Sequence, residues 1–347
     1  MRPIKLLLLA DTHIGFDSAA KPRVKRRRRG PDFLANMTRA LAPALAGEVD
    51  VVVHGGDFFH RPGIPDAVVR DGYAPILEVA DAGVPVFIVP GNHERSAMPL
   101  PLLLLHPNIH VFDRARSFSI WAGGQHLQVL GFPCLRNVAD YGLARIFAGT
   151  PVDQHATIRL LCMHQAFSGA QVGVQDYTFR GGADVVPAHD LPTGFAAVLS
   201  GHIHRAQVLT ESLAHERLPC PVIYPGSVER TSYAEREETK GYAVLTIEPS
   251  ATGGRVADVD FVPLPARPML GLPLNVRGLA ADGIDRLLRK RLAELPEDAV
   301  VRVEVIGLPE PGAHKALTAA KLRAAAPATM NVDMPRGRTM VGWHRID

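Results

Sequence analysis

The chain of 347 residues is long enough for one large domain and a smaller one, and 47% of its residues are hydrophobic, which can supply a core for each. A net charge of +3 excludes a protein that is basic throughout, but the segment from Lys21 to Arg29 is strongly basic and contains no acidic residue, which indicates a local surface for a polyanion. Three cysteines without paired spacing exclude a disulfide framework and a cysteine zinc site, and they favour a reducing, cytoplasmic location.

Apolar runs separated by helical patterns predict a parallel α/β unit in the first part of the chain. The run from Ile4 to Ala10 is too short to span a membrane and is predicted to be a buried strand. Further strands are expected at 50–53 and 84–89, and helices at about 32–47 and 67–82, where apolar residues recur at helical spacing. Strands that alternate with helices in this way are typical of a parallel sheet.

The rest of the chain is predicted to contain more strands and a second domain. Strands are expected at 110–112, 118–121, 127–132, 157–163, 195–199, 222–224, 242–247 and 256–262. Prolines then punctuate residues 263–273, which are predicted to link a first domain of residues 1–262 to a second of residues 274–347. In the second domain, strands at 274–276 and 300–306 and helices at about 284–295 and 315–325 predict a small α+β unit.

Polar side chains follow five of the predicted strands, at the point where each strand ends. They are Asp11, His13, Asp57, Asn92, His93, His164, His202 and His204. Because ligand sites in parallel α/β sheets lie just outside the carboxyl ends of strands, we expect these side chains to meet. Imidazole, carboxylate and amide donors without thiolate suit Mn²⁺, Fe or Zn²⁺, and this mixture favours Mn²⁺. One carboxylate shared by two ions would hold them about 3.5 to 4 Å apart, as in-line displacement at phosphorus requires.

Each of these motifs has an ordinary structural explanation when it is taken alone. Asp11 and His13 could form a cap or a turn, and Gly91-Asn92-His93 a simple turn. His164 could be a core histidine. His202 and His204 are a stronger signal, because alternation along an extended chain points both imidazoles to one face. The joint occurrence of all five motifs at strand ends favours a metal site.

Five motifs in this order resemble those of the calcineurin-like metallophosphoesterases. They are Asp11-Thr12-His13, Gly55-Gly56-Asp57-Phe58-Phe59-His60, Gly91-Asn92-His93-Glu94, Met163-His164-Gln165 and Gly201-His202-Ile203-His204. This resemblance covers residues 1 to about 262 and implies an α/β four-layer sandwich, two mixed β-sheets flanked by helices. More narrowly, the motif around Asp57 and the run from Tyr224 to Thr231 are similar to the Mre11/SbcD DNA-repair nucleases; Glu94 stands where the family commonly has Asp.

The resemblance implies a site for two divalent metal ions, with a role for each candidate residue. Asp11, His13, Asp57 and His204 would hold the first ion, and Asp57, Asn92, His164 and His202 the second, with Mn²⁺ favoured over Fe or Zn²⁺. His93 matches a catalytic histidine that lies near the scissile phosphate and protonates the departing oxygen. His60 matches a second such histidine, which handles the DNA strand in the nucleases; the alternative is an ordinary loop histidine.

The resemblance also implies partners. DNA would be the substrate, and the small second domain would be the cap that helps the nucleases to grip it. Contacts to backbone phosphates are expected from the basic residues Lys25, Arg26, Arg27, Arg28 and Arg29, unless they form only a solvated loop. The leucine-rich stretch 99–105 lies where the nucleases form homodimers, although core burial would also explain it. The nucleases usually continue past the cap into helices that bind a Rad50/SbcC-type ATPase, whereas this sequence ends at Asp347, so this partner is left open.

The sequence therefore predicts a metal-dependent DNA phosphodiesterase, an exonuclease or endonuclease that acts in DNA end processing. Two alternatives remain. The first is a stand-alone metallophosphoesterase for small nucleotides or other phosphodiesters, and the second is a DNA-end scaffold that binds without cleaving.

Overall fold

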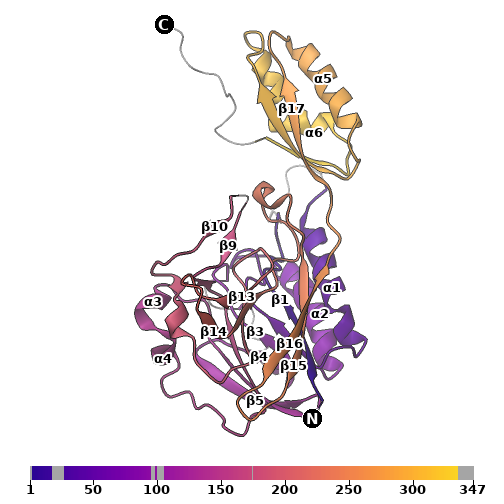
Figure 1. The fold of residues 1–347 in the computed structure, drawn as a ribbon. Helices are drawn as coiled ribbons and strands as arrows, with labels where there is room; N and C mark the ends of the chain where they lie inside the picture. The colour runs from indigo at the N-terminus through magenta and orange to yellow at the C-terminus, as the bar shows by residue number, and fades with distance from the viewer. Residues whose placement is uncertain (1, 18–26, 95–97, 100–104, 174, 335–347) are drawn as a thin grey trace. The chain divides into compact units, whose positions relative to one another are not determined.

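The computed structural model describes residues 2–17, 27–94, 98–99, 105–173 and 175–334 (Figure 1). The described residues fall into two compact units. The larger contains residues 2–17 and 29–265, and the smaller contains residues 27–28 and 266–334. In the described part of the chain, no helix combines the length and the apolar character that crossing a membrane requires.

Six strands form the first sheet of the larger unit, in the order β16-β15-β1-β2-β3-β4. Their bounds are Ile4–Leu9 (β1), Val51–His54 (β2), Val86–Ile88 (β3), Ile109–Val111 (β4), Gly241–Glu248 (β15) and Arg255–Pro263 (β16). Strands β1 to β4 are parallel, while β15 pairs antiparallel with β1 and β16 antiparallel with β15. The carboxyl ends of β1, β2 and β3 therefore share one edge of this sheet.

A second six-stranded sheet has the order β13-β14-β12-β7-β6-β5. Its strands are Arg116–Ala122 (β5), Gln125–Gly131 (β6), Ile158–Met163 (β7), Ala197–Ser200 (β12), Gln207–Glu211 (β13) and Arg217–Tyr224 (β14). The four inner strands are parallel, and the edge strands β5 and β13 are antiparallel to their neighbours. Two small pairs lie outside this sheet: β8 (Ala166–Phe167) with β11 (Val185–Val186), and β9 (Gln171–Val172) with β10 (Tyr177–Thr178).

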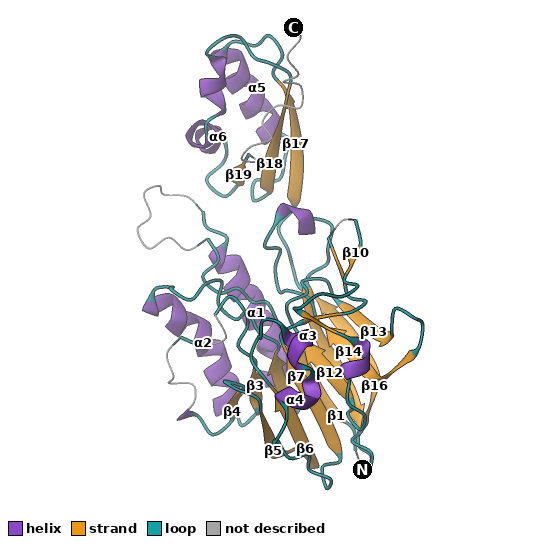
Figure 2. Ribbon diagram, turned by 90° about the vertical axis from the view of Figure 1, so that its left-hand side faces the viewer, coloured by secondary structure: helices purple, strands orange, loops and turns teal. Residues whose placement is uncertain are grey.

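Helices cover the outer faces of both sheets, which gives four layers (Figure 2). α1 (Gly30–Leu45) and α2 (Asp66–Asp81) lie against the first sheet, and the short α3 (Val138–Tyr141) and α4 (Leu143–Ile146) lie outside the second. Side-chain alternation in β1 explains the layering, because Leu7 packs with Phe33 of α1 while Leu6 and Leu8 share a core with Leu160 of β7. The predicted sandwich of two mixed sheets flanked by helices is confirmed.

The smaller unit has its own core, as the α+β prediction requires. Its parallel sheet has the order β17-β18-β19, with bounds Met269–Asn275, Val300–Ile306 and Asn331–Asp333. Its helices are α5 (Ala281–Ala293), α6 (Ala319–Ala325) and a 3-10 turn at Ala313–Leu317. Part of the segment expected as a linker, residues 263–273, is thus strand. Pro273 is tolerated in β17 because β17 is an edge strand, where a missing N–H breaks no ladder.

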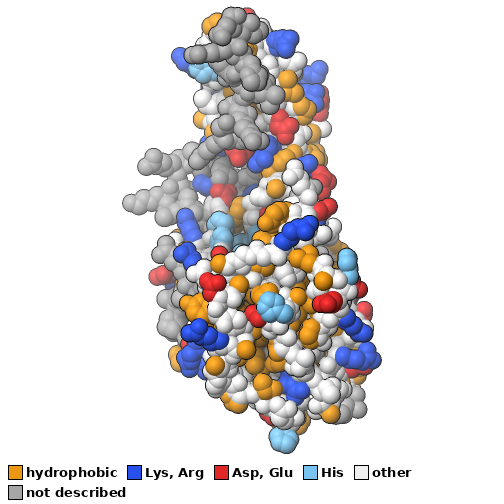
Figure 3. All heavy atoms as spheres, turned by 60° about the vertical axis from the view of Figure 1, so that its left-hand side comes forward, with side chains coloured by type: hydrophobic (Ala, Val, Ile, Leu, Met, Phe, Trp, Pro, Cys, Tyr) orange, Lys and Arg blue, Asp and Glu red, His pale blue; other side chains and the backbone are white. Residues whose placement is uncertain are grey.

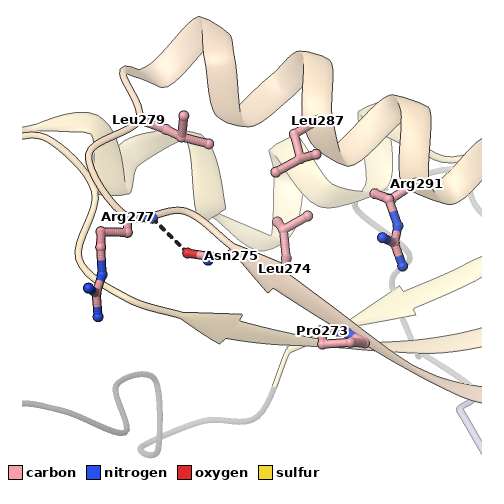
Figure 4. Close-up of a pocket in the computed structure, with 7 residues that line it drawn as sticks. All are labelled: Pro273, Leu274, Asn275, Arg277, Leu279, Leu287 and Arg291. Carbon is pink, nitrogen blue, oxygen red and sulfur yellow. Dashed lines mark hydrogen bonds between the residues drawn. The ribbon is translucent and has the colours of Figure 1, made fainter.

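A groove of about 470 Å³ lies between β17 and α5 of the smaller unit (Figure 4). It is lined by Pro273, Leu274, Asn275, Arg277, Leu279, Leu287 and Arg291. None of these lining residues is a carboxylate or an imidazole, so the groove is not the predicted metal site, which lies in the larger unit.

Candidate metal centre

The predicted metal ligands and catalytic histidines all lie at carboxyl ends of strands in the larger unit. Asp11 and His13 follow β1, Asp57 and His60 follow β2, Asn92 and His93 follow β3, His164 follows β7, and His202 and His204 follow β12. The first three strands belong to the first sheet, whereas β7 and β12 belong to the second. The site is therefore built where the ends of two sheets meet, and the structure brings all nine residues together.

Left-handed backbone conformations concentrate in these loops. Asp11, His13, Asp57 and His202 have positive φ angles of 51°, 42°, 49° and 80°. Residues other than glycine adopt the left-handed conformation rarely and at some energetic cost. Its repeated occurrence here turns the side chains toward one point and lowers local stability. Gly91 permits the close packing, since a Cβ at that position would collide with Asp57.

One group of candidate ligands is formed by Asp11, His13 and His204. The Nε2 atoms of His13 and His204 lie 3.1 Å apart, and His204 Nε2 is 4.0 Å from Asp11 Oδ1. One potential ligand atom from each of the three residues lies within 4.8 Å of the other two. Asp11 and His13 are almost fully buried. Ring nitrogens this close, beside a buried carboxylate, are arranged to share a proton or a cation.

A second group is formed by Asp57, His164, Asn92 and His202. Asn92 Oδ1 lies 3.0 Å from His164 Nε2 and 3.1 Å from His202 Nδ1, and His164 Nε2 is 3.4 Å from Asp57 Oδ1. On its other side, His164 Nδ1 donates a hydrogen bond to Gly55 O at 2.8 Å. This bond puts the ring proton on Nδ1 of the neutral imidazole, so its Nε2 faces the group as a ligand atom.

The two groups are linked electrostatically by Asp11, Asp57 and His164. Burial alone would raise the pKa of Asp57, but the charge of His164 and its hydrogen bond outweigh it and hold that pKa well below its usual range. Burial would lower the pKa of His164, yet Asp57 and Asp11 raise it to about 9. Burial also raises the pKa of Asp11 to about 6. The two carboxylates therefore favour positive charge between them.

His93 and His60 lie beside these groups and are half-buried. The backbone N–H of His93 donates to Asp57 Oδ1 at 2.9 Å, and its Nδ1 lies 2.6 Å from His60 O, which holds the ring with Nε2 3.8 Å from Asp57 Oδ2. The ring of His60 lies 5.3 Å from that of His93 and 5.4 Å from that of His13. Burial, followed by the charge of His93, lowers the pKa of His60.

Two further residues shape the site without having been predicted as parts of it. Glu94 is buried and accepts hydrogen bonds from the N–H groups of Phe59 at 2.5 Å and Gly91 at 2.7 Å, which joins the loops after β2 and β3. Burial, and then the charge of Asp57, raise its pKa to about 8. His54 is fully buried; its Nδ1 accepts from Gly56 N at 3.2 Å and its Nε2 lies 3.0 Å from the hydroxyl of Thr12. Burial lowers the pKa of His54 to about 3, so this histidine is neutral.

The basic tract divides between the two units. Lys25 and Arg26 lie outside the described residues, whereas Arg27 and Arg28 are half-buried and belong to the smaller unit. Arg29 is buried in the larger unit, where its guanidinium donates to Arg230 O at 2.6 Å and lies 3.4 Å from Glu229 Oε1. The side chain of Arg29 is therefore engaged within the larger unit, which does not favour a contact of this residue with DNA.

The surroundings of the site include the Ser227 loop and part of the leucine-rich stretch. Ser227 follows β14, is fully buried, and its N–H lies 3.2 Å from His204 O, so the Ser227 loop borders the site. Of the leucine-rich stretch 99–105, residues 100–104 lie outside the described residues. Among described side chains on the face drawn in Figure 3, lysine and arginine are scattered rather than gathered into one patch.

Residues 4–206 match the family model described as calcineurin-like phosphoesterase, which is more than half of the chain. The chain belongs to this family. The family implies a dinuclear site for divalent metal ions, and the structure supplies candidate ligand groups for it.

The chain is also similar to particular curated proteins. It is 30% identical over 316 residues to the DNA double-strand break repair protein Mre11 of Haloferax volcanii, which covers 87% of this chain and 61% of that protein. It is 26% identical over 322 residues to the protein of that name from Methanosarcina mazei, covering 88% of this chain and 46% of the relative. The chain thus spans less than two thirds of the length of either relative. A dimetal phosphatase from Danio rerio covers 74% of this chain and 99% of its own at 12% identity and a TM-score of 0.43, a likeness too slight to add to the argument.

The described residues fit two divalent cations. Two buried carboxylates, four imidazoles and one amide oxygen converge in two groups, and no thiolate is among them. Buried carboxylates at this density need positive charge close by, which bound cations provide. His13 Nδ1 is buried and has no hydrogen-bond partner among the described residues, so only its Nε2 is aimed at a partner in the group.

Proposed function

We propose that this chain is a Mn²⁺-dependent DNA nuclease of the Mre11 type that cleaves phosphodiester bonds at DNA ends. The observation that carries the proposal is the pair of half-exposed histidines, His93 and His60, beside two groups of candidate ligands that the buried Asp11 and Asp57 link. The similarity to the Mre11 relatives supports DNA as the substrate.

In this proposal each group holds one ion. Asp11, His13 and His204 would hold the first and Asn92, His164 and His202 the second, with Asp57 shared between them. The mixture of hard carboxylate and amide oxygens with borderline imidazoles favours Mn²⁺ over Zn²⁺. When bound, a pair of such ions supplies an activated water and stabilises the charge that develops on the phosphate.

The chain's own residues then have distinct tasks. His93 is held through Nδ1 by His60 O, so its Nε2 is positioned to give a proton to the departing oxygen. His60 would position the DNA strand beside it. Basic residues of the tract, Lys25 to Arg28, would contact backbone phosphates; Arg29 is left out because it is buried. The smaller unit would act as a DNA-binding cap.

Two partners form part of the proposal. A Rad50/SbcC-type ATPase is proposed from the resemblance to the nucleases, and a pull-down with such an ATPase tests it. A homodimer is proposed from the same resemblance, and sedimentation at several protein concentrations tests that.

The deciding experiment measures hydrolysis of linear duplex DNA and of a small phosphodiester. We expect the wild-type chain with Mn²⁺ to degrade linear duplex DNA, and His93→Ala to lose about 10²- to 10⁴-fold of this activity while it still binds metal. His189→Ala is the matched control, because His189 has an 83% exposed side chain and lies outside the site; it should retain full activity.

The outcome also distinguishes the alternatives. Hydrolysis of a small diester such as bis(4-nitrophenyl) phosphate, with linear DNA left intact, would replace the nuclease by a stand-alone phosphodiesterase. DNA binding without hydrolysis of either substrate would point to a scaffold.

A further inference from the structure

A buried ion cluster lies behind His204, on the side away from the other ligands. We name it the Lys240 cluster; it consists of Thr231, Glu235, Glu238 and Lys240. Glu235 ends a 3-10 turn, Tyr233–Glu235, that a capping box with Ser232 closes. The turn lies in the segment between β14 and β15, so the cluster is built by one short stretch of chain.

Lys240 is the centre of this cluster. Its side chain is fully buried, and its Nζ lies 2.7 Å from Glu235 Oε2, 2.7 Å from Glu238 Oε2 and 3.0 Å from His204 O. An ammonium group has three N–H donors, and these three acceptors use all of them. A buried lysine with complete partners is a fixed point, because any movement would leave a charge unpaired in the interior.

Glu235 connects Lys240 to the ring of His204. Its other oxygen, Oε1, lies 3.3 Å from His204 Nδ1. Thr231 Oγ1 is also 3.3 Å from Nδ1, but its hydroxyl donates to Glu235 Oε1 at 2.6 Å. Glu235 therefore orients the Thr231 hydroxyl as well as the ring. With a carboxylate facing Nδ1, the ring proton stays there and the lone pair of Nε2 points to His13 and Asp11.

We propose that Glu235, supported by the buried Lys240, is a positioning residue of the metal centre, which fixes the tautomer and the orientation of His204 for the ion held with Asp11 and His13. This inference rests on the proposed metal-binding function. Glu238 is not part of it, because Glu238 pairs with Lys240 but is not among the partners of the His204 ring.

Metal affinity tests the inference independently of catalysis. Mn²⁺ is titrated calorimetrically into metal-free protein, and we expect Glu235→Ala to weaken the affinity of one of two ions about 10- to 100-fold. Glu235→Gln keeps an oxygen for Nδ1 and should lose less. Glu238→Gln is the matched control: it removes the negative charge of one partner of Lys240 and should bind both ions as the wild type does.

A double variant distinguishes the loss of His204 positioning from unfolding of the protein. Glu235→Ala takes one of its two carboxylate partners from the buried Lys240, whereas Glu235→Ala with Lys240→Met removes both ends of this buried pair and should fold. Circular dichroism checks the fold, and the double variant should still bind Mn²⁺ weakly. Saturating Mn²⁺ should restore DNA cleavage by Glu235→Ala, which a loss of folded protein could not explain.

Three outcomes are informative. If the wild type binds two Mn²⁺ ions and Glu235→Ala binds them equally tightly, Glu235 does not position His204. The inference then fails, while the proposed function still stands. If Glu238→Gln loses as much affinity as Glu235→Ala, the cluster acts only through general stability, and the inference again fails. If the wild type binds no Mn²⁺, the proposed function fails and takes the inference with it.

Discussion

Replacing Glu94 by Ala should weaken the framework under Asp57. Glu94 is 2% exposed, and its carboxyl group accepts from the N–H of Phe59 at 2.5 Å and that of Gly91 at 2.7 Å. Without it, two buried N–H groups lack an acceptor, at about 1 to 3 kcal/mol each, so the free energy of unfolding should fall by about 2 to 6 kcal/mol. Glu94→Gln should cost about half as much, because its amide oxygen can serve one N–H while its NH₂ faces the other.

Urea unfolding of the metal-free protein at fixed pH, followed by circular dichroism, measures this loss. Glu78→Ala is the matched control, since Glu78 is exposed on α2, and it should change the free energy of unfolding by no more than about 0.5 kcal/mol. A loss in Glu94→Ala no larger than in Glu78→Ala would show that the carboxylate does not hold the two loops together.

Three further predictions separate stability, DNA binding and catalysis. Arg29→Ala removes the guanidinium that faces the buried Glu229, whose carboxyl group keeps the N–H of Arg230 as a partner, and should lower the free energy of unfolding by about 3 to 5 kcal/mol, without changing the salt dependence of DNA binding. Replacement of Lys25, Arg26, Arg27 and Arg28 by Gln should have the opposite effects. The urea midpoint should stay constant, while the magnitude of the slope of log affinity against log salt concentration should fall by about 0.9 for each DNA phosphate that the protein no longer neutralises. An unchanged slope would contradict the proposed role of the tract. His60→Ala should reduce cleavage of duplex DNA on the order of 100-fold, as loss of substrate positioning can, and leave hydrolysis of a small diester nearly unaffected; equal losses on both substrates would remove the DNA-handling role.

Much of the fold could be predicted because local patterns and tertiary structure agree. The run from Ile4 to Ala10 is apolar except for the exposed Lys5, since the rest of β1 is buried between α1 and the second sheet, and its two faces supply two different cores. The ligands were predictable for the same reason: a parallel strand delivers the residue after its carboxyl end to a known edge. Strand ends therefore carried most of the information about the site.

The features that the sequence did not predict depend on contacts between distant residues or on very short elements. Arg29 looked like the end of a charged loop, and only Glu229, far along the chain, makes it a core residue. The sequence did not predict that Lys240 is buried, because a buried lysine is recognised only by the acceptors that surround it. The strands β8 to β11 have two residues each, too few for periodicity to appear. Proline suggested that residues 263–273 are irregular, but an edge strand can hold Pro273.

In the proposed function, Asp57 joins two metal ions into one catalytic centre. Elemental analysis after loading with Mn²⁺ and gel filtration tests it most directly, in the wild type, Asp57→Asn and His93→Ala. We expect about two ions per chain in the wild type and in His93→Ala, and loss of both in Asp57→Asn, because the shared carboxylate serves each ion. Equal metal content in Asp57→Asn and His93→Ala would contradict the claim.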